Sequence, residues 1–157
     1  MRWRGPIIAG GLAIGLALPT SPAAAVDVTF TGLVVDTCSV ALATPGVMSL
    51  SGDGKVLATD QGGLAVPATV TVVSIGTNTL SLAPPTLDTY PAGYTPGGET
   101  LELSTSGLLS NPLFTTLGID GIIGLLPLTN LLVNLRITNP DGFEQGLYGA
   151  HTVLTCS

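Results

Sequence analysis

The sequence predicts an all-β protein, an antiparallel sandwich of two sheets, and three observations support this prediction. Charged residues make up only 9% of the chain, whereas Gly, Pro, Ser and Thr are abundant. Exposed helices depend on Glu, Lys, Arg and Gln, so this composition favours strands and turns. Short apolar alternations are separated by turn signals about every 8–12 residues, and no long helical periodicity is present.

The first 25 residues are predicted to be a secretory signal peptide. Arg2 and Arg4 precede an apolar run, Pro6 to Leu18, and Ala23 to Ala25 supplies the small residues that signal peptidase requires. A membrane anchor is the alternative, but the run is shorter than the ~20 residues that span a bilayer. We expect cleavage after Ala25, which leaves a single domain, 26–157, with no stable membrane span.

The predicted mature chain is acidic. The full chain has a net charge of −6, and removal of Arg2 and Arg4 leaves Lys55 and Arg136 as its only Lys and Arg residues. Nucleic acids and anionic membrane surfaces are bound through clustered basic side chains. We therefore expect neither as a partner.

Two cysteines, Cys38 and Cys156, lie near the two ends of the predicted domain. Export would place them in an oxidising compartment, where disulfides form and persist. An intramolecular bridge would join the first and last strands, and closing so long a loop would stabilise the fold by roughly 4–5 kcal/mol. Free thiols and an intermolecular bridge are the alternatives.

The first predicted strand runs from Val26 to Val40, because Val28, Phe30 and Val34 recur on one face with period two. The strand from Leu64 to Ile75 has no strongly polar face, which predicts a central position in a sheet. Further elements expected in this half are strands at 47–50, 55–58 and 79–83 and a hairpin turn at 51–54.

A proline- and glycine-rich stretch, Pro84 to Gly98, is predicted to be a long surface loop. It carries Tyr90 and Tyr94, and exposed aromatic residues on a loop are candidates for a contact site. The simpler alternative is that the two rings pack down and pin the loop.

The second half of the chain is more apolar. In the strand predicted from Leu131 to Thr138, four residues are expected to face inward: Leu131, Val133, Leu135 and Ile137. The segment around 122–128 is interpreted as core or, alternatively, as an interaction surface. Its candidate contact residues are Ile122, Ile123, Leu125 and Leu126. Strands are also expected at 99–106 and from Leu147 to Cys156.

Catalytic and cofactor signatures are not evident in the sequence. His151 is the only histidine, and no pair of the ten acidic residues suggests a general acid and base. Asp53, Asp60, Asp141 and Glu144 match no calcium-binding spacing. We therefore expect no cofactor, no metal and no enzymatic activity, because a hydrolase would require these side chains to converge in a pocket.

Both ends of the predicted domain resemble bacterial fimbrial (pilin-like) subunits of the chaperone–usher type. The matching stretches are VTFTGLVVDTCSV (28–40) and FEQGLYGAHTVLTC (143–156), and PATVTVVS (67–74) is similar in texture to the family's central strand. The resemblance implies an immunoglobulin-like sandwich, export to the periplasm, and a structural or adhesive role at the cell surface.

The resemblance also implies protein partners. In that family the sandwich lacks one strand, and a periplasmic chaperone and then a neighbouring subunit, assembled at an usher, fill the groove by strand addition. Here we expect such a groove to be lined by residues from Ile122 to Ile137. The alternative is a self-contained secreted β-sandwich that recognises a protein or glycan through loops such as 84–98. A complete or an incomplete sandwich distinguishes the two.

Overall fold

A computed structural model describes residues 31–33 and 35–157. These residues contain strands, turns and loops but no helix, and so no helix among them is long and apolar enough to cross a membrane. The predicted all-β class is confirmed. The predicted signal peptide and residues 26–30 lie outside the described residues. Residues before Leu33 form a separate unit, and the fold below is that of Leu33–Ser157.

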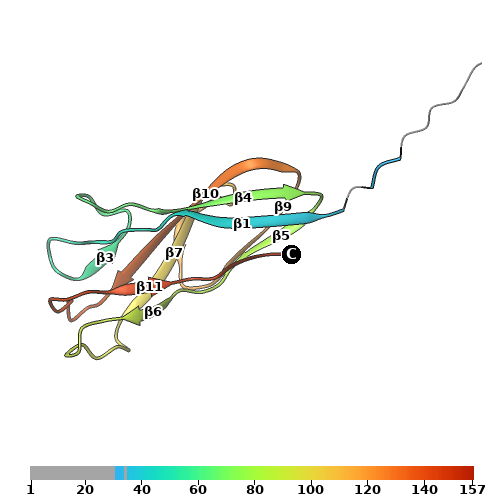
Figure 1. Cartoon of the computed structure of the whole chain (residues 1–157). Coiled ribbons are helices and arrows are strands. Elements are labelled where there is room, and N and C mark those ends of the chain that lie inside the picture. The colour runs from blue at the N-terminus through green and yellow to red at the C-terminus, as the bar shows by residue number, and fades with distance from the viewer. Residues whose placement is uncertain (1–30, 34) are drawn as a thin grey trace, which may run out of the picture. The chain divides into compact units, whose positions relative to one another are not determined.

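The larger sheet is antiparallel and has seven strands (Figure 1). Its centre is the long strand β10, which pairs with β4 and β3 along one edge and with β7 along the other. β1 lies outside β4, and β8 lies outside β7. The strands are β1 (Thr37–Thr44), β2 (Ser49–Leu50), β3 (Val56–Ala58), β4 (Ala68–Ile75), β7 (Thr100–Gly107), β8 (Asn111–Thr115) and β10 (Leu126–Thr138).

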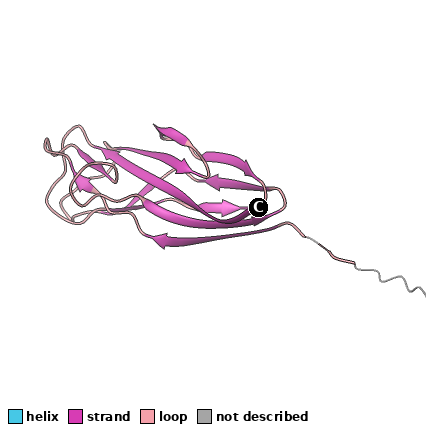
Figure 2. Ribbon diagram, turned by 90° about the horizontal axis from the view of Figure 1, so that it is seen from above, coloured by secondary structure: helices cyan, strands magenta, loops and turns pink. Residues whose placement is uncertain are grey.

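Two small antiparallel sheets form the second layer (Figure 2). One has the order β12 (Leu154–Cys156), β5 (Asn78–Leu82), β9 (Ile119–Ile123). The other pairs β11 (Gly149–His151) with β6 (Thr86–Thr89). A hydrogen bond from the Ala83 amide to the Val153 carbonyl (2.9 Å) lies between them, so the paired segments β5–β6 and β11–β12 run side by side across both sheets.

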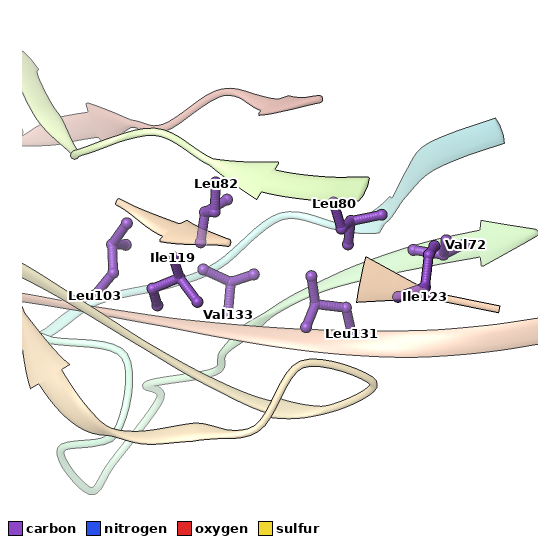
Figure 3. Close-up of a cluster of buried hydrophobic side chains, with 8 residues drawn as sticks. All are labelled: Val72, Leu80, Leu82, Leu103, Ile119, Ile123, Leu131 and Val133. Carbon is purple, nitrogen blue, oxygen red and sulfur yellow. The ribbon is translucent and has the colours of Figure 1, made fainter. Parts of the chain in front are cut away.

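The core lies between the larger sheet and the β5–β9 pair (Figure 3). Period-two alternation places one side chain in every two on this face, and each fully buried aliphatic side chain stabilises the fold by about 1.5–3 kcal/mol. The inward orientation predicted for Leu131, Val133 and Ile137 is confirmed by their burial, and Leu135 is partly buried. The cluster consists of Val72, Leu80, Leu82, Leu103, Ile119, Ile123, Leu131 and Val133.

The first strand begins later than the sequence predicts. Its first residue is Thr37 rather than Val26, and the described residues before it, through Asp36, are not in a strand. The reason lies in its partner: Thr37 pairs with Ile75, the last residue of β4, so earlier residues have no strand to pair with in this sheet.

Three other boundaries differ from prediction. The predicted loop 84–98 contains β6, which gains its strand character from pairing with β11. β8 was not expected because it contains Pro112, but it pairs only with β7, and a proline is tolerated on such an edge. The apolar segment around 122–128 is the end of β9 and the start of β10, with a register shift between Leu126 and Thr129.

The predicted disulfide is confirmed. Cys38 in β1 and Cys156 in β12 are bonded, with Cα atoms 6.0 Å apart and a sequence separation of 118. The bond joins the outer strand of the larger sheet to the outer strand of the second layer, so the first and last strands are held together at one end of the sandwich.

Candidate functional groove

The edge of the sandwich between β1 and β11–β12 is open. β1 pairs only with β4, β11 only with β6, and β12 only with β5. Across the described part of the chain, no backbone hydrogen bond joins β1 to β11 or β12. Both layers therefore present unpaired peptide groups at this edge, which is the arrangement that can template a further strand.

The inward face of β1 is not covered by the second layer. Val40 and Leu42 lie opposite Val72 and Val70 of β4, and directly opposite residues of an antiparallel pair share a face. Val72 is fully buried in the core, yet Leu42 is 64% exposed. β1 thus carries apolar residues toward the interior where no residue packs against them.

An apolar cavity of about 280 Å³ occupies this open region. Leu42 and Val70 line it from the larger sheet, Ala150 and Leu154 from the second layer, and Leu103 and Val133 from the core. We call this region the β1–β12 groove. Its polar lining is limited to Thr59, His151 and Thr152.

The two ends of the groove differ. The Cys38–Cys156 disulfide crosses between its walls at one end, while Pro45, Gly46 and Met48 border the other, which we call the mouth. The stretch of β1 from Ser39 to Thr44 spans about 20 Å at the usual strand rise. An extended guest segment of about six residues therefore fits between the disulfide and the mouth.

His151 lies at the margin of the groove. Its Nδ1 contacts the carboxylate of Asp88 and lies 3.3 Å from the Thr86 hydroxyl, across the β11–β6 pair. Both partners of this ion pair are exposed, so it contributes little to stability. Within residues 31–33 and 35–157, no group of three or more His, Cys, Asp and Glu side chains is placed to hold a metal ion.

A second hollow, of about 300 Å³, lies between the 93–98 and 139–144 loops. Its main polar groups are bonded to one another. Asn139 Nδ2 donates to the Tyr94 hydroxyl (3.1 Å) and to the Gly142 carbonyl (2.8 Å), and the Tyr94 hydroxyl donates to Glu99 Oε2 (3.2 Å). These bonds fix the loops and leave few free groups for a ligand.

The same network shifts two pKa values. Burial raises the pKa of Tyr94, and the neighbouring Glu99 charge adds to this effect. Burial alone would raise the pKa of Glu99, but hydrogen bonds from the Gly97 amide and the Tyr94 hydroxyl outweigh it and hold that pKa below its usual value. Both shifts favour the hydrogen-bonded pair in which Tyr94 is neutral and Glu99 is ionised.

The predicted contact residues fall into three environments. Tyr90 is exposed, whereas Tyr94 is buried and packs edge-on against Tyr148, with ring centroids 5.2 Å apart. Ile122 and Leu125 are strongly exposed at the turn between β9 and β10. Ile123 belongs to the core, and Leu126 packs against it.

The groove is built from a different set of residues than expected. The predicted range, Ile122 to Ile137, contributes Val133 and Leu135, while the other walls come from β1, β4 and the β11–β12 segment. Leu42 and Leu154 were not singled out in the sequence. Each belongs to an ordinary period-two alternation, and nothing local distinguishes an uncovered apolar residue from a core residue.

No family model, curated protein or solved structure matches this chain. The function is therefore argued from the geometry of the groove and the sequence around it.

Proposed function

We propose that this protein is a non-catalytic structural or adhesive subunit of the bacterial cell surface, similar to a fimbrial subunit, that receives an extended segment of another chain in the β1–β12 groove. The observation that carries the proposal is the uncovered inward face of β1. Leu42 and Val40 are oriented like core residues but lack a packing partner, and the strand beside them has a free edge.

A guest strand has two sources of favourable free energy in this groove. Apolar guest side chains would cover Leu42 and fill the cavity, and each buried aliphatic side chain contributes about 1.5–3 kcal/mol. Peptide groups of the guest would also pair with the free edge of β1, at about 0.5–1.5 kcal/mol net for each hydrogen bond. This is recognition by strand addition.

The guest that fits is the segment that precedes β1. With the predicted cleavage after Ala25, the segment Val26–Asp36 reads VDVTFTGLVVD, in which Val28 and Phe30 alternate with threonines. That pattern offers apolar side chains on one face of a strand, as the groove requires. In the same proposal, a periplasmic chaperone occupies the groove before assembly and an immunoglobulin-like arrangement describes the sandwich.

Export is part of the proposal. The disulfide between Cys38 and Cys156 matches an oxidising compartment such as the periplasm or the cell surface. Its place between the first and last strands also keeps the groove walls together before a guest arrives.

The test is peptide binding. The full chain is expressed in an exporting host, its monomeric form is purified, and a synthetic Val26–Asp36 peptide is added while the melting temperature and the stoichiometry are recorded. We expect one peptide per chain and a rise of several degrees at saturation, since a ligand specific for the folded state stabilises it.

The matched variants are Leu42→Arg and Leu113→Arg. Both leucines are strongly exposed, so both variants should fold, but only Leu42 lines the groove, whereas Leu113 is on β8. Leu42→Arg should abolish the peptide effect and Leu113→Arg should retain it. Equal binding by both variants, or a wild-type monomer that melts cooperatively and ignores the peptide, would instead favour the self-contained binding module.

A further inference from the structure

The sandwich carries exposed apolar side chains at both ends, outside the groove. At the disulfide end, the turn between β9 and β10 presents Ile122, Leu125 and Leu128, which we call the cap; Leu125 is 74% exposed. The register places this turn beside the disulfide, because Leu126 at the start of β10 and Cys38 of β1 both lie opposite Ser74.

A second apolar patch lies at the mouth end. Val47 and Val66 face each other in an isolated antiparallel bridge, with both backbone hydrogen bonds formed (2.8 and 2.9 Å), and both are exposed. Leu64, two residues before Val66, is 84% exposed. We call these three residues the mouth patch, since Gly46 and Met48 on either side of Val47 line the groove.

The groove admits a guest in one direction. The disulfide joins the two walls at one end, so an extended segment enters past Pro45 and Met48 and runs toward Cys38. The donor segment leaves its own domain at Thr37, the start of β1, which is the disulfide end of the donor. Insertion therefore brings the disulfide end of one domain against the mouth end of the next.

The donor cannot be the same copy. To reach its own mouth, the segment before β1 has to run back along the eight residues of β1, about 26 Å at the usual strand rise. The eleven residues of Val26–Asp36 reach at most about 36 Å when fully extended. Too few residues would then remain to fill the groove, so the donor has to be a second copy of this chain.

From these observations we infer that the cap of one copy packs on the mouth patch of the next copy, forming a head-to-tail interface. The inference rests on the proposed function, because the strand exchange supplies the direction. The six residues of the two surfaces carry no charge, so neither surface opposes the contact electrostatically. The surfaces differ and lie at opposite ends, so the contact is heterologous and repeats along a filament.

A charge exchange tests whether the two surfaces meet. Leu125→Lys and Leu64→Glu, made separately in the full exported chain, should each raise the concentration for half-association by about tenfold or more, measured by sedimentation velocity. In the double variant every interface pairs the new lysine with the new glutamate, so association should recover most of that loss. Leu113→Lys, on β8 and equally exposed, is the control and should associate like the wild type.

Peptide binding separates failure of this inference from failure of the proposed function. The cap and mouth-patch variants leave the groove lining intact and should bind the Val26–Asp36 peptide as the wild type does. If they bind peptide but also associate like the wild type, the interface is wrong and the strand exchange stands. Loss of association without recovery in the double variant also overturns it, because the cap would then contact another surface, such as lipid. If the wild type does not bind peptide, both proposals fail.

Discussion

Leu131 and Leu42 flank the same residue on the same face of the same sheet. Both lie directly opposite Val70, Leu131 from β10 and Leu42 from β1. Leu131 is fully buried, whereas Leu42 is 64% exposed. The difference comes from the second layer: β5 and β9 cover β10, and no described segment covers this part of β1. The sandwich is thus closed over its centre and open along one margin.

This contrast indicates that burial here is decided by the opposite layer rather than by the strand itself. The two leucines have the same residue type, secondary structure and neighbouring residue, and they differ only in what lies above them. The closed region accounts for stability, and the open margin accounts for the proposed binding. Variants that affect one region and not the other therefore test this division.

The largest effect is expected from removal of the disulfide. The double variant Cys38→Ser, Cys156→Ser should lose about 4–5 kcal/mol of unfolding free energy in urea, because a sequence separation of 118 gives a large loop-closure term. β1 is held to the second layer mainly by this bond, so loss of β1 packing adds to the effect. A loss below about 1 kcal/mol would mean that the open margin is held by other contacts. The wild type in reductant is the control.

The two leucines give the next comparison. Leu131→Ala removes a fully buried side chain from the core and should cost about 2–5 kcal/mol. Leu42→Ala should cost about 0.5 kcal/mol or less in the isolated chain, because its side chain is already largely in water. Urea unfolding of both variants under one set of conditions measures the ratio. Equal costs would show that β1 is covered in solution.

Asn78 tests the closed end near the disulfide. Its buried side-chain amide donates to Ser74 Oγ (2.8 Å), the Ile75 carbonyl (3.1 Å) and the Thr37 carbonyl (3.3 Å), and so joins β4, β5 and the start of β1. Asn78→Ala leaves these acceptors without a partner and should cost about 1–3 kcal/mol in thermal unfolding.

The matched control for Asn78 is Thr71→Ala. Thr71 makes an exposed hydrogen bond to Asn130 (3.4 Å) on the outer face of the same sheet, where water replaces the lost partner. Its cost should stay within about 0.5 kcal/mol. Similar costs for the two variants would contradict the assignment of Asn78 as a tie between strands.

The smallest effect concerns the 93–98 loop. The pKa of Glu99 is lowered from 4.5 in the folded state, so its contribution is present above that value and is lost as the pH falls through the folded-state pKa. We expect Glu99→Gln to be about 0.5–1 kcal/mol less stable than the wild type at pH 7, with the difference closing below pH 4. Melting curves across this pH range measure it. A difference that persists in acid would point to packing rather than charge.

The predictable parts of this fold are those that local pattern and covalent chemistry determine. The alternation from Leu131 to Ile137 predicted a core strand, the Ser51–Gly54 stretch predicted the turn between β2 and β3, and the two cysteines predicted the disulfide. Each of these rests on side-chain periodicity, on a glycine with positive φ such as Gly54, or on the small number of possible pairings.

The less predictable parts depend on partners distant in the sequence. β6 lies just after Pro84 and Pro85, which indicated a loop, and it is a strand because β11 lies beside it. The groove brings Leu42 together with Leu154, and the sequence alone does not state which of two similar alternations lacks a cover. Only the register between β1, β4 and β10 reveals the vacancy.

The disulfide has a mechanical consequence. Only Ser157 follows Cys156, and β1 begins one residue before Cys38, so a pulling force applied between the N-terminal segment and the C-terminus passes from one cysteine directly to the other. The twelve strands hang from this covalent link without bearing the load. Under tension at its ends the oxidised chain cannot lengthen by unfolding, and only reduction releases the 118-residue loop as slack.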